Sequence, residues 1–144
     1  MAFDAHRLAF HRQLGHVTVP GVFDAARTDA AIADIQAWGE QVLADLPASQ
    51  RAWYVDGGVT ARTVLRKLDN PHHHREPFST ALLLLLAFHA PLVEIVERMI
   101  GPGVSVYFSQ VFFKPPEGGG PKPAHQDNFY FGPNDEEGVV TAWI

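Results

Sequence analysis

The pattern of the chain changes from helical to strand-like at residues 104–114, which read VSVYFSQVFFK. Nearly all of these residues are β-branched, aromatic or small, and the run is too long and regular for a loop. It is therefore predicted to form a core strand. Residues 139–144, VVTAWI, have the same character and predict a second strand after the Gly/Pro-rich segment 115–123.

The part that precedes residue 104 is predicted to be mainly helical. Helix boundaries are indicated by a glycine after the first helix, by an aspartate and a proline around the second, and by prolines before the last two. The predicted helices cover residues 4–14, 24–46, 78–89 and 92–100, and shorter strands are predicted at 16–23 and 63–65. Helices followed by strands indicate an α+β fold.

Composition excludes several classes of protein. With 47% apolar residues, the 144-residue chain can bury an ordinary core, and one domain is expected. Sixteen acidic and eleven basic residues give a net charge of −5, which argues against a nucleic-acid surface. There are no cysteines, so a metal would have to be bound by His, Asp or Glu.

No membrane span or secretion signal is predicted. The most apolar run, residues 81–88, is far shorter than the roughly 20 residues that a spanning helix needs. The first residues, MAFDAHR, lack the basic start and hydrophobic stretch of a signal peptide. A cytoplasmic protein is therefore expected.

His125 and Asp127 form the motif that can bind a metal. Residues two apart in a strand point to the same face, so these two side chains can present their donor atoms to one point. An imidazole nitrogen and a carboxylate oxygen, completed by a second histidine, form the facial set that binds iron(II). The tripeptide alone is a weak signal, because it also occurs in zinc hydrolases or as a surface aspartate beside a capping histidine.

The surrounding sequence resembles the phytanoyl-CoA dioxygenase family over most of the chain. The strongest matches are Phe113-Lys114-Pro115-Pro116, then residues 125–131 (HQDNFYF), then residues 139–143 (VVTAW). Weaker matches are residues 15–19 (GHVTV) and residues 100–102 (IGP). The order and spacing of these segments are far more specific than His-x-Asp alone.

The resemblance implies a fold and a set of site residues. The fold would be N-terminal helices packed on a double-stranded β-helix, or jelly roll, with His125 and Asp127 as iron ligands. Trp143 would line the pocket of the co-substrate 2-oxoglutarate, and Gln110 would face that co-substrate. Lys67 would supply a positive charge near it, although Arg66 is equally close in the sequence.

The implied reaction is hydroxylation of a small or lipid-like molecule with dioxygen, as 2-oxoglutarate is converted to succinate. Related halogenases replace the ligand carboxylate with a small residue, whereas Asp127 is retained here. The family pattern places a third ligand, a histidine, and a carboxylate-binding arginine on later strands. Residues 1–144 are therefore expected to form one incomplete domain that is inactive by itself.

Two other functions stay open at this point. A noncatalytic β-helix binding module, or an inactive truncated product, is the main alternative, and a zinc hydrolase that uses His125 and Asp127 is another. The run His72-His73-His74 is interpreted as a solvated loop, because three consecutive side chains fan out instead of converging on one ion.

Overall fold

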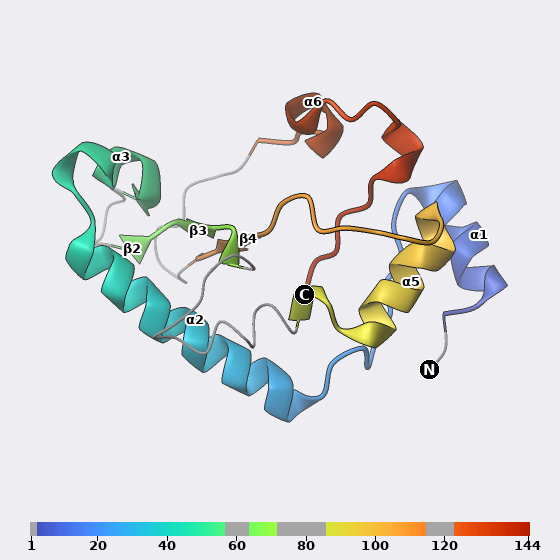
Figure 1. Cartoon of the computed structure of the whole chain (residues 1–144), viewed down its shortest axis with the longest axis horizontal. Helices are drawn as coiled ribbons and strands as arrows, with labels where there is room; N and C mark the ends of the chain where they lie inside the picture. The colour runs from blue at the N-terminus through green and yellow to red at the C-terminus, as the bar shows by residue number, and fades with distance from the viewer. Residues whose placement is uncertain (1–2, 57–63, 72–85, 115–122) are drawn as a thin grey trace. The chain divides into compact units, whose positions relative to one another are not determined.

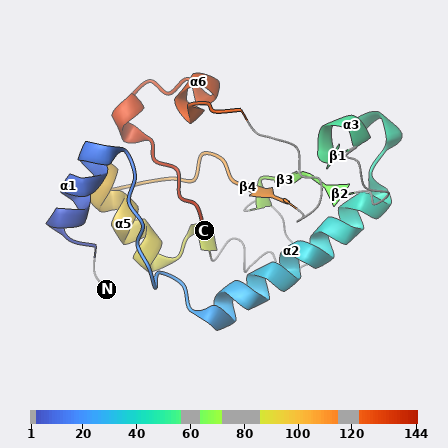
Figure 2. The same cartoon turned by 180° about the vertical axis from the view of Figure 1, so that it is seen from behind.

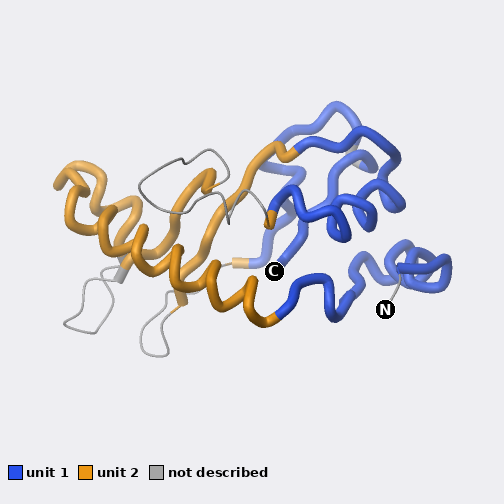
Figure 3. Tube along the Cα trace, turned by 60° about the horizontal axis from the view of Figure 1, so that its bottom comes forward, with its two compact units in different colours: residues 1–24, 87–105, 124–144 blue, residues 25–86, 106–123 orange. Residues whose placement is uncertain are grey.

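The computed structural model describes residues 3–56, 64–71, 86–114 and 123–144. These residues form two compact units, each assembled from segments that are far apart in the sequence (Figure 3). Unit 1 contains residues 1–24, 87–105 and 124–144, and unit 2 contains residues 25–86 and 106–123. The expectation of one domain over residues 1–144 stays a prediction.

Unit 1 is built from short helices that can be located in Figure 1: α1 (Ala5–Leu14), α5 (Ala90–Ile100), α6 (Asp127–Phe131) and the 3₁₀ helix η3 (Glu136–Gly138). The Asp4 carboxylate caps α1 by accepting from the Arg7 backbone amide at 2.9 Å. The Arg98 guanidinium on α5 donates to the carbonyl of Phe3, whose side chain is buried. The α5 helix is thereby joined to the start of the chain.

Unit 2 combines the long helix α2 (Ala25–Asp45) with two small antiparallel sheets. Its other elements are η1 (Ala48–Gln50), α3 (Arg51–Tyr54), β1 (Val55–Asp56), β2 (Val64–Leu65), β3 (Lys67–Asp69) and β4 (Gln110–Phe112). Strand β1 pairs with β2, and β3 pairs with β4. Strands β3 and β4 lie side by side in Figures 1 and 2. In the second pair Lys67 is opposite Phe112 and Asp69 is opposite Gln110.

The core of unit 2 lies against α2. Trp38 on this helix is buried, as are Leu65 and Leu68 on the strands. Next to Trp38, Gly39 lies so close to Leu65 and Phe113 that an added Cβ would be 3.4 Å from each side chain. A small residue at this position therefore allows the helix to approach the strand segments closely.

The predictions for the helices at 4–14, 24–46 and 92–100 are confirmed within a few residues by α1, α2 and α5. Their local end signals hold as well, since Gly15 follows α1 with φ of 76° and Pro91 is in the first turn of α5. Most of the helix predicted at 78–89, and the His72–His74 loop, lie outside the described residues.

Several strand predictions are wrong. Residues 16–23 contain no strand, and Pro20-Gly21 makes a turn there instead. Of the strand predicted at 104–114, Gln110–Phe112 forms a strand, which pairs with β3. Backbone hydrogen bonds from Phe113 to Arg66 and from Asn70 to Ser109 flank this pair, whereas residues 104–108 form no strand. Residues 139–144 are extended without a ladder partner among the described residues.

At the level of fold class, the structure agrees with the α+β expectation, because helices dominate and the strands form small antiparallel sheets. No helix among the described residues has the length and apolarity needed to cross a membrane.

Candidate functional site

The His125-Gln126-Asp127 segment lies at a junction between extended chain and the helix α6. Gln126 is the extended N-cap residue, with φ of −111° and ψ of 128°, and Asp127 is the first residue of the helix. Gly132 ends the helix in the left-handed conformation, with φ of 54°. The prediction that both residues belong to one strand is therefore wrong.

The two side chains nevertheless converge. His125 Nε2 lies 3.5 Å from Asp127 Oδ1, and the side chains are 35% and 36% exposed. Two donors that each lie about 2.0–2.2 Å from one ion can be at most about 4.4 Å apart. The separation and the partial exposure thus fit a shared divalent cation that is reached from solvent.

Each of the two side chains has a further neighbour in unit 1. Thr141 Oγ donates a hydrogen bond to Asp127 Oδ2 at 2.8 Å. The Tyr130 ring meets the His125 ring edge-on, with centroids 5.7 Å apart. The sequence analysis did not single out Thr141. Its position two residues before Trp143 was a usable signal, because residues two apart lie on the same side of an extended segment.

The described residues bring two metal donors together here and not three. No group of three or more His, Asp or Glu side chains converges anywhere in the ranges that the structure describes. Trp143 belongs to the same unit as His125 and Asp127, and 83% of the residue's surface is exposed. A role for it in a co-substrate pocket stays a prediction.

The other two predicted site residues, Lys67 and Gln110, meet in unit 2. Both donate to the Asp69 carboxylate, Lys67 Nζ to Oδ2 at 3.0 Å and Gln110 Nε2 to Oδ1. The strand register explains the meeting: Lys67 and Asp69 are two apart on β3, and Gln110 is opposite Asp69 on β4. Lys67 and Arg66 were the two candidate cations near the co-substrate. Lys67 shares the Asp69 carboxylate with Gln110, whereas Arg66 is exposed.

Lys67 is unusually buried for a lysine, with 9% of its surface exposed. Its ammonium lies 4.3 Å from the centre of the Trp53 ring and 5.5 Å from that of Tyr54. Burial raises the pKa of the Tyr54 hydroxyl, and the negative charge of Asp69 raises it further. The cation is therefore stabilised by one carboxylate and two aromatic faces.

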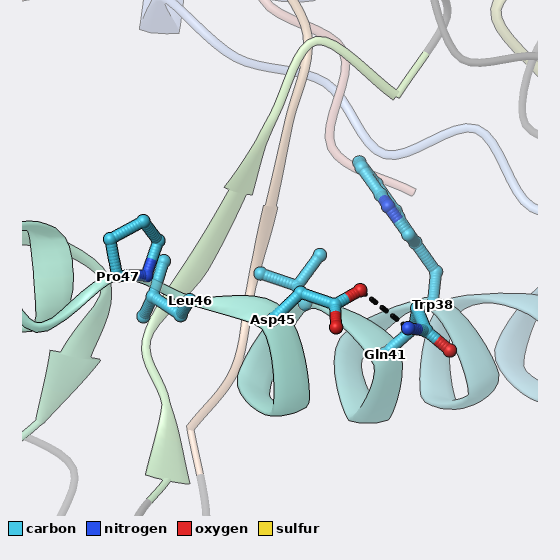
Figure 4. A pocket seen from close by; sticks show the side chains of 6 residues that line it. Trp38, Gln41, Asp45, Leu46 and Pro47 are labelled. Carbon is cyan, nitrogen blue, oxygen red and sulfur yellow. Dashed lines mark hydrogen bonds between the residues drawn. The ribbon is translucent and has the colours of Figure 1, made fainter.

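A separate hollow of about 290 Å³ lies along the last turns of α2. Trp38, Val42, Leu46 and Pro47 supply its apolar lining, and Gln41 donates a hydrogen bond to Asp45 at its edge (Figure 4). It contains no histidine and no cationic side chain. This hollow is therefore distinct from the predicted site residues and lacks their chemistry.

Comparison with known proteins gives one family. The family model described as phytanoyl-CoA dioxygenase matches residues 11–144, which is nearly the whole chain. No curated protein and no solved structure matches the chain. The matched range contains all of the predicted site residues in both compact units.

Proposed function

The chain belongs to the phytanoyl-CoA dioxygenase family, and we propose that it is an iron(II)- and 2-oxoglutarate-dependent oxygenase that hydroxylates a small or lipid-like molecule. Family membership points to an oxygenase with dioxygen and a small-molecule substrate. The finer assignment is supported by one observation above all: an imidazole nitrogen and a carboxylate oxygen converge to 3.5 Å at a partly exposed position.

In this proposal His125 and Asp127 are two ligands of the iron. A neutral nitrogen donor and a hard anionic oxygen suit iron(II) and leave coordination positions open for small molecules. Bound iron would supply the redox chemistry in which one oxygen atom of dioxygen hydroxylates the substrate and the other enters succinate, with release of carbon dioxide from 2-oxoglutarate. The double-stranded β-helix that would carry these ligands is also part of the proposal.

Lys67, Gln110 and Trp143 are proposed to serve the co-substrate. A dianionic 2-oxo acid needs a cation or hydrogen-bond donors at its far carboxylate. Lys67 and Gln110 supply both kinds of group, and their common contact with Asp69 supports a shared role. Trp143 would contribute an apolar wall. The expected cytoplasmic location stays a prediction.

The metal assignment can be tested without turnover. Paramagnetic Mn²⁺, used as a stand-in for iron(II), should broaden the NMR signals of the His125 imidazole and of residues 126–128 first. His125→Ala and Asp127→Ala should each remove this selective broadening, because either change leaves a single donor.

His89 provides the matched control in the same unit. Its Nε2 lies 2.8 Å from the Val22 carbonyl, and its ring stacks on Phe23 with centroids 4.8 Å apart. His89→Ala should therefore leave the broadening at His125 unchanged. Broadening that centres on another histidine, or that survives Asp127→Ala, would show that the iron assignment is wrong.

A noncatalytic binding module is the second candidate. It is favoured by the finding that the described residues bring only two donors together, since two protein donors hold a divalent ion weakly. Turnover of 2-oxoglutarate to succinate, measured on a protein that supplies a third metal ligand, distinguishes the two candidates, because a binding module would not decarboxylate the co-substrate.

A further inference from the structure

The two carboxylate oxygens of Asp127 have different neighbours. Oδ1 faces His125 Nε2 at 3.5 Å, whereas Oδ2 accepts a hydrogen bond from Thr141 Oγ at 2.8 Å. We propose that Thr141 is a positioning residue of the metal centre, whose hydroxyl orients the Asp127 carboxylate so that Oδ1 points toward the ion. This inference rests on the proposed function, because it assumes that Asp127 is a ligand.

An orienting partner matters at this position because Asp127 is the first residue of a short helix and its side chain is partly exposed. The side chain is 36% exposed and belongs to a helix of only five residues. An exposed carboxylate samples broad rotations about its last side-chain bond. A hydrogen bond to an ionised acceptor is stronger than one between neutral groups, so the hydroxyl can select one of these rotations.

The chemistry of the contact suits a supporting role. A hydroxyl has one proton to donate, and here it is directed at the oxygen that does not face His125. Oδ1 therefore keeps its lone pairs for a metal. In addition, threonine is β-branched, so its side chain has few rotamers and holds the hydroxyl at a defined place.

Thr141 also lies 14 residues after Asp127 in the chain. The hydrogen bond therefore joins α6 to the extended segment 139–144, both of which belong to unit 1. A merely structural role would be to fasten this segment to the helix. The experiment must separate that role from positioning of the ligand.

The test compares Thr141→Val with Thr141→Ser by measuring the Kd for Mn²⁺ from the loss of the free-ion EPR signal. Valine has nearly the same shape but no hydroxyl, and we expect Mn²⁺ binding about 10- to 100-fold weaker, as for other partners of metal ligands. Serine keeps the hydroxyl, and its Kd should stay within about threefold of the wild-type value.

Thr28→Val is the matched control. Thr28 also donates a hydrogen bond through its hydroxyl, to the Ala25 carbonyl at 2.9 Å, but in α2 of the other unit. This variant should bind Mn²⁺ as the wild type does. Amide NMR spectra of every variant report on folding, and Thr141→Ala replaces the valine variant if valine disturbs the spectrum.

Each outcome is decisive. Wild-type affinity in Thr141→Val, with broadening still at His125, would overturn the inference and leave the proposed function intact. Weak binding by Thr141→Ser, or loss of the native spectrum in both the valine and alanine variants, would also overturn it by showing a structural role. A wild-type protein without Mn²⁺ binding at His125 would instead refute the proposed function, and the inference with it.

Discussion

At the scale of single residues, the role of each carboxylate depends on the group that donates a hydrogen bond to it. Asp4 accepts from a backbone amide and caps a helix. Asp69 accepts from a lysine and a glutamine and neutralises a buried charge. Asp127 accepts from a hydroxyl through one oxygen, and its other oxygen faces His125. Only the last arrangement leaves an oxygen directed at a second metal donor.

The cap at Asp4 predicts a dependence of α1 on pH. The hydrogen bond from the Arg7 backbone amide is the largest cause that lowers the pKa of Asp4 below its ordinary value. A lowered folded-state pKa contributes stability above the unfolded pKa of about 3.9, and this contribution is lost as the pH falls through the folded value. The protection factor of the Arg7 amide against hydrogen exchange should therefore fall in that acidic range.

A matched pair of variants isolates the charge from the cap. Asparagine caps helices about as well as aspartate but does not titrate in this range, so Asp4→Asn should keep the protection of Arg7 and lose its acid dependence. Asp4→Ala should lose the protection at every pH. Equal acid dependence in the asparagine variant would show that another group is responsible.

The sequence predicted that the His125 and Asp127 side chains converge, and they do, although the strand assumed for this prediction is absent. Residues two apart do not face each other within a helix, but the backbone is still extended at Gln126 and the helix begins only at Asp127. The two side chains therefore converge as they would on a strand. Thr141 could not be predicted in the same way, because its contact depends on how the chain returns to α6 after 14 residues.

At the scale of elements, the β3–β4 pair is held by the Lys67–Asp69 ion pair as well as by its ladder. Replacing Asp69 with leucine leaves a nearly buried ammonium without its carboxylate and should lower the free energy of unfolding by about 1–3 kcal/mol. The double variant Lys67→Met/Asp69→Leu should lose less than the sum of the single variants, by about 1 kcal/mol or more. Urea denaturation of the four proteins measures this coupling.

The Glu94–Arg98 pair on α5 is the control for that cycle. Its atoms are closer, at 2.7 Å, but its side chains are 65% and 51% exposed. A solvent-exposed pair one helical turn apart contributes only about 0.3–0.5 kcal/mol. A coupling in β3 as small as this value would mean that Lys67 is solvated and that the buried cluster does not form.

Gly39 allows a test of how α2 packs within unit 2. Gly39→Ala should raise the free energy of unfolding by up to about 1 kcal/mol, because alanine favours the helix and its methyl would meet Leu65 and Phe113 at van der Waals distance. Gly39→Leu should instead lower it by about 1–3 kcal/mol, because the larger side chain overfills the contact. Thermal unfolding followed by circular dichroism distinguishes the two. Stabilisation by leucine would contradict the close packing at this position.

Helices could be predicted from the sequence better than strands for a physical reason. The ends of α1 and α5 depend on neighbours within a few residues, such as Asp4, Gly15 and Pro91. A strand needs a partner that is distant in the chain, and β4 is only as long as the three residues of β3 that pair with it. The apolar run at 104–114 could show a preference for strand, but it could not show where the pairing stops.

At the scale of the whole molecule, the segments of the two units alternate along the chain. His125, Asp127 and Trp143 belong to unit 1, whereas Lys67 and Gln110 belong to unit 2. The family match, over residues 11–144, includes segments of both units. Family motifs mark His125, Asp127 and Trp143 as candidates in the sequence, whereas Asp69, which joins Lys67 to Gln110, carries no such mark.

The last prediction concerns the catalytic activity of the 144-residue polypeptide and follows from the number of metal donors. The described residues bring together an imidazole and a carboxylate, and no third His, Asp or Glu joins them there. Binding of a metal depends on a complete and deprotonated ligand set, so two donors should hold iron(II) too weakly for turnover. Purified protein with iron(II), ascorbate and 2-oxoglutarate should therefore form no succinate above the level in buffer. Asp127→Ala, measured in parallel, should give the same background. Succinate that forms with the wild-type chain and disappears with Asp127→Ala would contradict this prediction and show that the chain supplies a third ligand from outside the described residues.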